Sequence, residues 1–438
     1  MANTYLERTS WGTPTNTYKA TFSAWIKRGT LTSNNERILC ARASSANTGE
    51  IALQTSNELR IYQYVGAEQI NVKTNRMFRD TSAWYHIVVA FDTTQGTSTD
   101  RIKVYVNGVQ ETSFANTTYP SQNETLAINN SLNPTRIGTS STASDTFFTG
   151  SMSHIHFIDG TAYDASAFGE TDATTGEWKA KTSPSVTYGT NGFFILKDGN
   201  GITDQSGEGN DFTLGGGTLT DLKDNPDNTF ATWNPLVITS TGGVAVRTPG
   251  FQNSNTTALF DDSGNNEFAL SSLAPSKGKY YAEFKWVNAT GNGSSSVGIV
   301  KADFILQTDI NDQGVVYKGD GNKVVNNSNS SYGASWTTGD IIAIVLDCDS
   351  NTVNFYKNNA AQGSISIDAD TDWYMFCSSY ALSSVTRSVN ANFGNGYFGT
   401  TAITTNSGNG YAGAEGASKF NYTVPTGYSA LSTKGLNE

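Results

Sequence analysis

Residues 84–92, WYHIVVAFD, and residues 101–108, RIKVYVNG, decide the fold class of this chain. Both stretches are short, rich in β-branched and aromatic residues, and patterned with a period of two, which is typical of β-strands. The second stretch ends on Asn-Gly, a pair that favours a tight hairpin turn. We therefore predict an antiparallel hairpin here.

The same pattern recurs in the second half of the chain. Residues 336–347, WTTGDIIAIVLD, again combine a Trp with an apolar strand that ends in Asp, and residues 352–359, TVNFYKNN, close on Asn. Around them we expect only one short helical turn, near residues 164–168, because no segment sustains a helical period. The pattern predicts an all-β protein of antiparallel sandwiches. Further strand-like stretches lie at residues 17–28, 58–65, 152–160, 279–287 and 372–379.

The composition of the sequence changes between residues 198 and 240. Three consecutive glycines (215–217), Pro226 and Pro235 interrupt the strand pattern there. A chain of 438 residues is also too long for one hydrophobic core. We therefore predict two domains, residues 1–222 and residues 223–438.

The charge balance excludes two classes of partner. The chain has 39 acidic and 28 basic side chains, a net charge of -11, whereas a nucleic-acid or anionic-membrane binder needs a basic face. No apolar run approaches the ~18 residues of a membrane span, and the first residues lack the apolar core of a signal peptide. We expect no nucleic-acid partner and no membrane insertion.

The cysteine and histidine positions predict no metal or catalytic site. Cys40, Cys348 and Cys377 lie far apart in the sequence without zinc-ligand spacing. His154 and His156 share a strand face, but two ligands do not make a metal site. We expect His86 to pack or to bond locally.

The acidic residues also argue against an enzyme. Glycoside hydrolysis needs two carboxylates about 5–10 Å apart, and no strand with a Glu-x-Asp-x-x-Glu pattern exists here. Asp347 and Asp349 share a face at a strand end, where we predict a turn role, with calcium binding as the alternative. The loop from Asp198 to Asp211 also has the oxygen-rich composition that suits Ca²⁺, although such loops occur simply as turns. We predict no catalytic, cofactor-binding or metal-binding residue, with Ca²⁺ as the alternative to no cofactor.

Aromatic residues divide into two groups by their surroundings. The strand-borne group is predicted to lie in the core, and the group in Gly/Asn/Thr-rich stretches to be freer, as residues that stack on sugar rings are. The first group is Trp25, Trp84 and Trp336; the second is Trp178, Tyr188, Tyr397 and Tyr411.

Several of these motifs resemble known families. The first half resembles the laminin-G-like, concanavalin A-like jelly rolls in FSAWIKRG (22–29), WYHIVVAFD (84–92), KVYVNG (103–108) and DQSGEGNDF (204–212). The second half resembles SPRY domains, which are also concanavalin-like sandwiches. One departure is Asn359, where that family usually has Gly, but Asn tolerates a positive φ. The SPRY-like elements are GKYYAEF (278–284), Gly298, Tyr332-Gly333, WTTGD (336–340), LDCDSNTVNFYKN (346–358), ANFG (391–394) and PTGYSAL (425–431).

The combined arrangement, with DNPDNTFATWNPL (224–236) between the domains, is similar to structural proteins of tailed bacteriophages, notably marine ones. This resemblance implies a virion protein in multiple copies per particle. We expect a tail or fibre-like appendage that binds host-surface glycan, with other virion proteins as partners. A capsid decoration or tail-assembly subunit is the alternative, and a SPRY adaptor that binds a peptide is a third.

Overall fold

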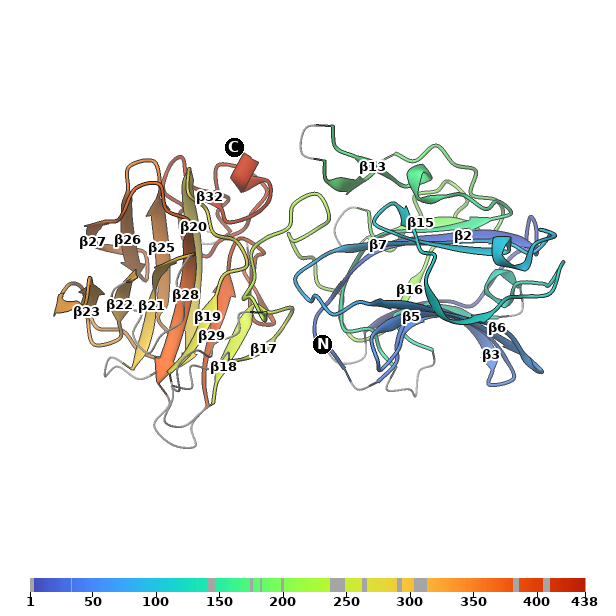
Figure 1. Ribbon diagram of the computed structural model, residues 1–438, viewed down its shortest axis with the longest axis horizontal. Coiled ribbons are helices and arrows are strands. Elements are labelled where there is room, and N and C mark those ends of the chain that lie inside the picture. Colours follow the sequence, from blue (N-terminus) through green and yellow to red (C-terminus); the bar gives the residue numbers. More distant parts are fainter. Residues whose placement is uncertain are drawn as a thin grey trace. The chain divides into compact units, whose positions relative to one another are not determined.

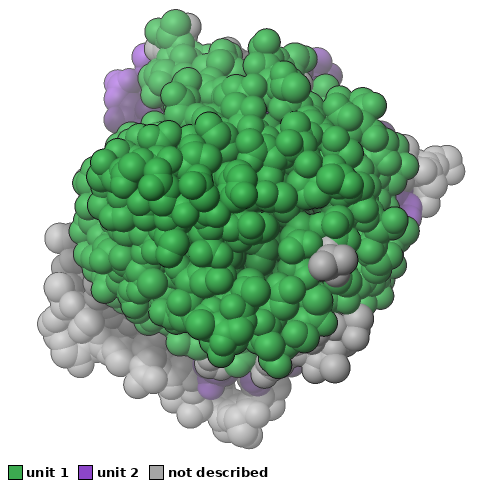
Figure 2. Space-filling model, turned by 90° about the vertical axis from the view of Figure 1, so that its right-hand side faces the viewer, with its two compact units in different colours: residues 1–221 green, residues 222–438 purple. Residues whose placement is uncertain are grey.

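The computed structural model divides into two compact units, residues 1–221 and residues 222–438, which Figure 2 colours separately. Each unit is described by itself below. The structure describes residues 4–32, 34–131, 133–140, 146–173, 176–181, 183–197, 201–236, 249–261, 266–289, 294–302, 313–380, 386–404 and 410–437.

Unit 1 is a sandwich of two antiparallel sheets (Figure 1). The eight-stranded sheet has the order β10 (Phe114–Thr118), β6 (Glu68–Met77), β5 (Glu58–Val65), β4 (Asn47–Leu53), β3 (Glu36–Ser44), β11 (Thr135–Ile137), β1 (Tyr5–Arg8), β16 (Thr213–Gly216). The six-stranded sheet has the order β15 (Phe193–Ile195), β12 (Gly150–Asp159), β2 (Lys19–Arg28), β7 (Tyr85–Asp92), β8 (Ile102–Val106), β9 (Val109–Gln110). A separate hairpin joins β13 (Gly169–Thr171) to β14 (Trp178–Ala180).

The predicted hairpin is confirmed, because β7 pairs with β8 in antiparallel register. The Asn-Gly pair then makes the next turn, from β8 to β9, with φ of 48° at Asn107 and 82° at Gly108. A Cβ atom at Gly108 would lie 2.7 Å from the indole of Trp178. Glycine is therefore required here both by the turn and by the ring packed against it.

The core of unit 1 lies between its two sheets. Alternate residues of each strand point into it, for example Ile51 and Leu53 of β4 facing Val89 and Phe91 of β7 in one apolar cluster. β7 is buried along almost its whole length on both faces. Something must therefore also cover its outer face.

Unit 2 repeats the two-sheet architecture. The larger sheet has the order β17 (Gly250–Gln252), β18 (Thr257–Phe260), β29 (Arg387–Asn392), β20 (Lys279–Asn288), β25 (Ile341–Asp347), β26 (Thr352–Lys357), β27 (Ala360–Ser366), and β32 (Ser429–Ala430) adds to β20. The six-stranded sheet has the order β19 (Asn266–Leu270), β28 (Trp373–Tyr380), β21 (Ser295–Lys301), β22 (Gly314–Lys318), β23 (Asn322–Val325), β24 (Ser328–Ser331). A short hairpin joins β30 (Tyr397–Phe398) to β31 (Thr401–Ala402).

Unit 2 also confirms its predicted hairpin strands, since β25 pairs with β26. The following turn holds Asn358 and Asn359 at φ of 47° and 71°. Asn359 thus adopts the positive φ for which the SPRY family usually has Gly. The core between the sheets is rich in aromatic rings, with Trp286 and Trp336 5.4 Å apart between ring centroids.

Helix is limited to short 3-10 turns in the described residues. The turn expected near residues 164–168 is confirmed as Ala165–Ala167, where the Asp164 carboxylate accepts a hydrogen bond from the Ser166 N–H. The other 3-10 turns are Ser98–Asp100, Ala127–Asn129 and Gly435–Asn437.

The three cysteines are free and buried. Burial raises the pKa of Cys40 to about 11 and that of Cys348 to about 12, and it places the pKa of Cys377 well above its ordinary value.

Candidate functional site

One sheet of unit 1 has a covered outer face. We call residues 163–188 the unit 1 cover segment, of which 174, 175 and 182 lie outside the described residues. Its Phe168 and Tyr188 pack against Val88 and Phe194 of the six-stranded sheet. In Figure 1, β13 lies above β2, β7 and β15, on the side away from β3, β5 and β6. The cover explains why β7 is buried on both faces.

His86 fastens the cover segment to this sheet. Trp178 Nε1 donates to His86 Nδ1 over 2.9 Å, and because an indole can only donate, Nδ1 carries no proton. Nε2 is therefore protonated and lies 2.9 Å from Ser23 Oγ, to which it donates. The Trp25 ring stacks on the imidazole at 4.8 Å. Burial, together with nearby His154, lowers the pKa of His86 to about 3, so the ring stays neutral.

The other two histidines lie in the same covered layer. His156 Nδ1 is 2.9 Å from the Tyr188 hydroxyl, and its ring stacks on Phe194 at 3.9 Å. His154, at a bulge with φ of 47°, is 2.8 Å from Ser153 Oγ through Nδ1 and also contacts Phe194. Burial lowers the pKa of His156 well below its ordinary value. Within the described residues, no group of three His, Cys, Asp or Glu side chains could hold a metal ion.

The structure corrects one expectation in this layer. His86 packs as expected, stacked on Trp25, while its hydrogen bond with Trp178 joins residues 92 positions apart in the sequence. Tyr188 is not free: it is the last residue of the cover segment and is buried against the sheet, where its hydroxyl meets His156. Trp25 and Trp84 are buried as predicted, yet they lie in this outer layer rather than between the sheets. These contacts were missed because they depend on how a loop folds back over a strand.

The outer face of the eight-stranded sheet is polar instead. Strand register aligns one row of side chains across seven strands, and no apolar cluster of the described residues forms on this face. We call this surface the open face. The row runs Glu7, Arg136, Cys40, Glu50, Tyr62, Asn71, Thr118.

Glu50 is the centre of the open face. Its carboxylate accepts from Arg37 Nε at 3.0 Å on one side and pairs with Arg60 Nη2 on the other. The guanidinium of Arg60 lies 4.3 Å above the ring of the adjacent Tyr62. Such pairs hold flat aromatic and guanidinium groups in fixed positions at the surface, which is the arrangement that recognises planar or ring-shaped ligands.

A second row lies two residues along the strands. Arg42 of β3 is opposite Thr48 of β4, which is opposite Tyr64 of β5. Arg42 is half-buried and forms no ion pair with any described residue. Its neighbours toward Glu50 are the short side chains of Cys40 and Thr48, whose Sγ and Oγ1 atoms are 3.7 Å apart. Only the alternation of the strands could have indicated this face from the sequence.

The loop for which Ca²⁺ binding was the alternative is internally hydrogen-bonded over its described residues, 201–211. Asp204 accepts four hydrogen bonds, from the N–H groups of Phe194, Ser206 and Asn210 and from the Ser206 hydroxyl. Its own N–H donates to Asp211 Oδ1 at 2.7 Å. Asp198 lies outside the described residues. The carboxylate of Asp204 thus acts as the organiser of a turn.

In unit 2, Asp347 and Asp349 have the predicted turn role. Asp347 Oδ1 accepts from the N–H groups of Asp349 and Ser350, and its Oδ2 is 3.0 Å from Lys279 Nζ. Asp349 accepts from the Gly278 N–H at 2.8 Å. These contacts lower the pKa of Asp347 even though its partial burial opposes them.

Unit 2 also has a covered sheet. We call residues 396–431 the unit 2 cover segment, of which 405–409 lie outside the described residues. Its Phe398, Ile403 and Tyr422 pack on Ile341 of β25. Glu283 of β20 anchors it by accepting from the N–H groups of Asn421 and Tyr422, both at 2.8 Å.

Glu283 collects two further donors. The Tyr281 hydroxyl is 3.1 Å and Asn392 Nδ2 3.3 Å from its carboxylate oxygens. All four partners donate, which favours the ionised form. Complete burial outweighs them and raises the pKa of Glu283 to about 7.

The remaining sheet face of unit 2 differs from the open face of unit 1. The six-stranded sheet carries a second apolar cluster besides the core, including Phe268, Val300 and Phe376, all of them buried. Tyr397 was expected to be freer, but it is buried within the β30–β31 hairpin, whereas Tyr411 is half-buried. The open face of unit 1 thus differs from this sheet face in being polar, with the half-exposed rings of Tyr62 and Tyr64 on it.

This architecture defines a nearly all-β protein built from two antiparallel sandwiches. Residues 2–166 match the concanavalin A-like lectin/glucanases superfamily, and residues 279–395 match the SPRY domain family. The chain thus contains a concanavalin A-like domain followed by a SPRY domain, two families that are typically non-catalytic binding domains. No helix in the described part of the chain is long and apolar enough to cross a membrane.

Solved structures give similar matches. The SPRY domain of human HERC1 is 24% identical, covers 31% of this chain and 87% of its own length, and has a TM-score of 0.28. Domain 4 of AbnA, a GH43 extracellular arabinanase from Geobacillus stearothermophilus in complex with arabinotriose, is 16% identical, covers 33% of this chain and 63% of its own, and has a TM-score of 0.26. No curated protein matches the sequence.

Proposed function

We propose that this chain is a non-enzymatic surface protein of a phage virion, and that the open face of unit 1 binds host-surface glycan. One observation carries the binding proposal. Tyr62 and Tyr64 stand on the outer face of one strand, opposite the accessible hydrogen-bonding side chains of Asn71 and Glu68. Aromatic rings that pack on sugar faces, flanked by groups that bond sugar hydroxyls, are what a carbohydrate site needs.

The chemistry of the chain supports a binding role over catalysis. The acidic side chains with catalytic potential are occupied: Asp204 and Asp347 hold turns, and Glu283 anchors a cover segment. Ser23 and His86 are hydrogen-bonded but completely buried beneath the unit 1 cover segment, where no substrate reaches them. A tail or fibre-like appendage would present the open face in multiple copies, which raises avidity.

A glycan array with the purified full chain tests this proposal. We expect attachment, and we expect Tyr62→Ala to weaken it about tenfold, because one buried aromatic contact contributes of the order of 1–2 kcal/mol. Tyr18→Ala is the matched control, since Tyr18 is an exposed tyrosine of unit 1 outside the open face. Absence of binding to every glycan and to host cells would contradict the proposal.

The alternative is a capsid decoration or tail-assembly subunit that contacts other virion proteins. β27 favours it, because this strand ends the sheet order of unit 2 and five of its seven residues are exposed. A free sheet edge of this kind pairs readily with a strand of another chain. Labelling the chain in images of the particle would separate a fibre position from a capsid position.

A further inference from the structure

We propose that the open face selects an acidic polysaccharide, which it holds through Arg42 and the neighbouring Arg37–Glu50–Arg60 group. This inference rests on the proposed glycan-binding function of the same face and names the chemical class of its ligand.

The distribution of arginine singles out this face. Nine of the eleven arginines lie in unit 1, and four of them are on the open face. The open face holds five of the 28 basic side chains but only four of the 39 acidic ones, so it is the reverse of a chain with a net charge of -11. The bases are Arg37, Arg42, Arg60, Lys73 and Arg136; the acids are Glu7, Glu50, Glu58 and Glu68.

The positive excess is concentrated at one place. Arg136 pairs with Glu7, and Lys73 with Glu58 at 3.8 Å, so these charges cancel. Glu50, in contrast, serves both Arg37 and Arg60, which leaves one positive charge in that group. Arg42 adds a second, because no described acid pairs with it, and the exposed Glu68 opposite Tyr64 reduces the excess over the whole face to one.

The side chains between these two positive centres are short. Cys40 and Thr48 separate Arg42 from Glu50, and Tyr64 flanks them on the next strand. Cys40 and Thr48 are themselves buried, so the partly exposed guanidinium groups of Arg42, Arg37 and Arg60 are the groups that an anion can contact. Guanidinium binds carboxylate or sulfate through two parallel hydrogen bonds, while the tyrosine ring packs on the adjoining sugar.

The same charges argue against a nucleic acid as the ligand. A duplex binder neutralises a run of phosphates with many cations, whereas this face carries an excess of one over its full width. A saccharide with spaced carboxylates or sulfates matches two positive centres beside two tyrosines. Charge complementarity thus favours an acidic polysaccharide over both a neutral one and a nucleic acid.

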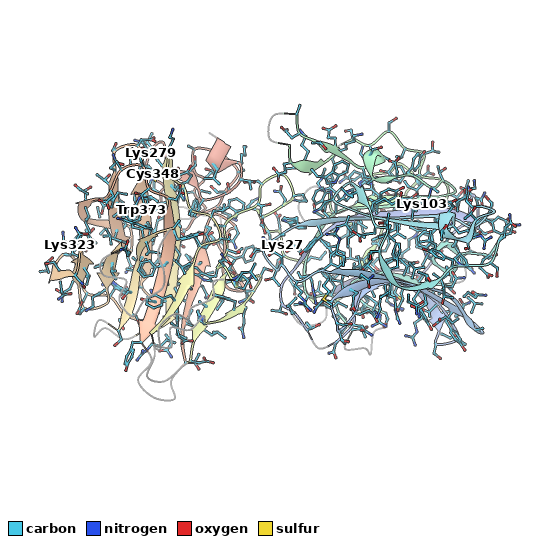
Figure 3. All side chains as sticks on the ribbon, viewed as in Figure 1. Lys27, Lys103, Lys279, Lys323, Cys348 and Trp373 are labelled. Carbon is cyan, nitrogen blue, oxygen red and sulfur yellow. The ribbon has the colours of Figure 1, made fainter. Side chains whose placement is uncertain are left out.

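Biolayer interferometry on the full chain tests the assignment, with alginate as the carboxylate probe, dextran sulfate as the sulfate probe, and neutral dextran and single-stranded DNA as comparisons. We expect one acidic probe to bind best, and Arg42→Gln to weaken it about tenfold, the effect of losing one charge-assisted hydrogen-bond pair. Arg42→Lys keeps the charge but loses the two parallel hydrogen bonds of a guanidinium group. Its affinity for the acidic probe should therefore lie between those of the wild type and Arg42→Gln. Lys103→Gln is the matched control and should change binding less than about twofold; Lys103, labelled in Figure 3, lies on β8 of the other sheet.

The outcomes separate the two proposals. Binding of dextran or another neutral glycan that Arg42→Gln leaves unchanged would overturn the acidic assignment but keep the glycan function. Equal binding of single-stranded DNA and the acidic probes would also overturn the acidic assignment, because it would show that the face binds any polyanion. Binding to no saccharide at all would instead overturn the proposed function. Thermal unfolding of Arg42→Gln at the wild-type temperature establishes that the variant is folded.

Discussion

The two units each fold a segment over one sheet face, but they anchor these cover segments with opposite chemistry. In unit 1, neutral His86 accepts a hydrogen bond from Trp178 of the cover. In unit 2, the carboxyl group of Glu283 accepts the N–H groups of Asn421 and Tyr422 of the cover. One architecture therefore contains two titratable anchors that should respond to pH in opposite directions.

Acid should loosen unit 1. The unfolded chain takes up a proton at His86 below pH 6.5, whereas the folded chain does so only near pH 3. The unfolded state thus binds more protons in this window, so the stability that His86 contributes is complete above pH 6.5 and is lost as the pH falls. A protonated His86 Nδ1 would also face the Trp178 N–H, donor against donor.

Base should loosen unit 2. Folded Glu283 holds its proton up to a pH of about 7, but the unfolded chain releases it near 4.5. The stability that this group contributes is therefore complete below pH 4.5 and is lost as the pH rises through about 7.

Removing the anchor of unit 2 should have the largest effect. Glu283→Ala leaves four buried donors without an acceptor, so we expect the free energy of unfolding of unit 2 to fall by about 3–5 kcal/mol. Hydrogen exchange of β20 and of residues 420–422 in the full chain measures this locally. Asp368→Ala, at an acid that is two-thirds exposed, is the control and should change exchange little. Unchanged protection in Glu283→Ala would show that the cover does not depend on this carboxyl group.

Replacing His86, the anchor of unit 1, should change how steeply the stability of this unit depends on pH rather than its stability at neutral pH. Below pH 6.5 the stability that His86 contributes falls with a slope that approaches about 1.4 kcal/mol per pH unit near pH 5, and His86→Gln should remove that slope. Hydrogen exchange of β7 and the unit 1 cover segment across this range gives the slope. Peptides from unit 2 in the same variant provide the control, because their pH response should stay as in the wild type. Identical slopes in both proteins would refute the role of His86.

A smaller effect is expected from the other half of the same contact. Trp178→Phe keeps a ring over Gly108 but removes the indole N–H, so the cover of unit 1 should lose about 1 kcal/mol. Tyr105→Phe, in the same layer, is the control and should change stability by less than ~0.5 kcal/mol. Equal exchange rates for the two variants would mean that ring packing alone holds the segment.

The smallest effect should come from the start of the unit 1 cover segment. Asp164→Ala removes the acceptor for the Ser166 N–H and hydroxyl, an exposed cap of a single 3-10 turn. We expect about 0.5 kcal/mol, seen as faster amide exchange of residues 166–168 only. Faster exchange throughout β13 and β14 would show that the cover opens as one unit from this end.

The strands of both units were predictable, and their covers were not. Short β-branched and aromatic stretches bounded by turn residues identified β7, β8, β25 and β26, and a period of two marks β8 and β26, which have one face in the sandwich core. The contact of Trp178 with His86 joins residues far apart in the sequence, which no local pattern records. A signal was nevertheless present: IVVAF in β7 and IIAIVL in β25 are continuous apolar runs, typical of strands buried on both faces.

The open face shows a second limit of sequence reasoning. Alternation along β4 and β5 indicates that Glu50 and Tyr62 point away from the core. That these residues face each other, and share a row with Arg136 and Asn71, depends on strand order and register. Residue types could be read from the sequence, but their assembly into one surface could not.

The cysteines have a practical consequence for how this protein can be handled. Because the thiolate is the reactive form, thiols that are both buried and hard to deprotonate neither cross-link nor oxidise readily. The stability of the folded chain should therefore be the same in reducing and oxidising solutions, because these thiols form no disulfide bond. A thiol-labelling reagent would then modify only unfolded molecules. The labelling rate of Cys40 would measure the unfolding of unit 1, and that of Cys377 the unfolding of unit 2.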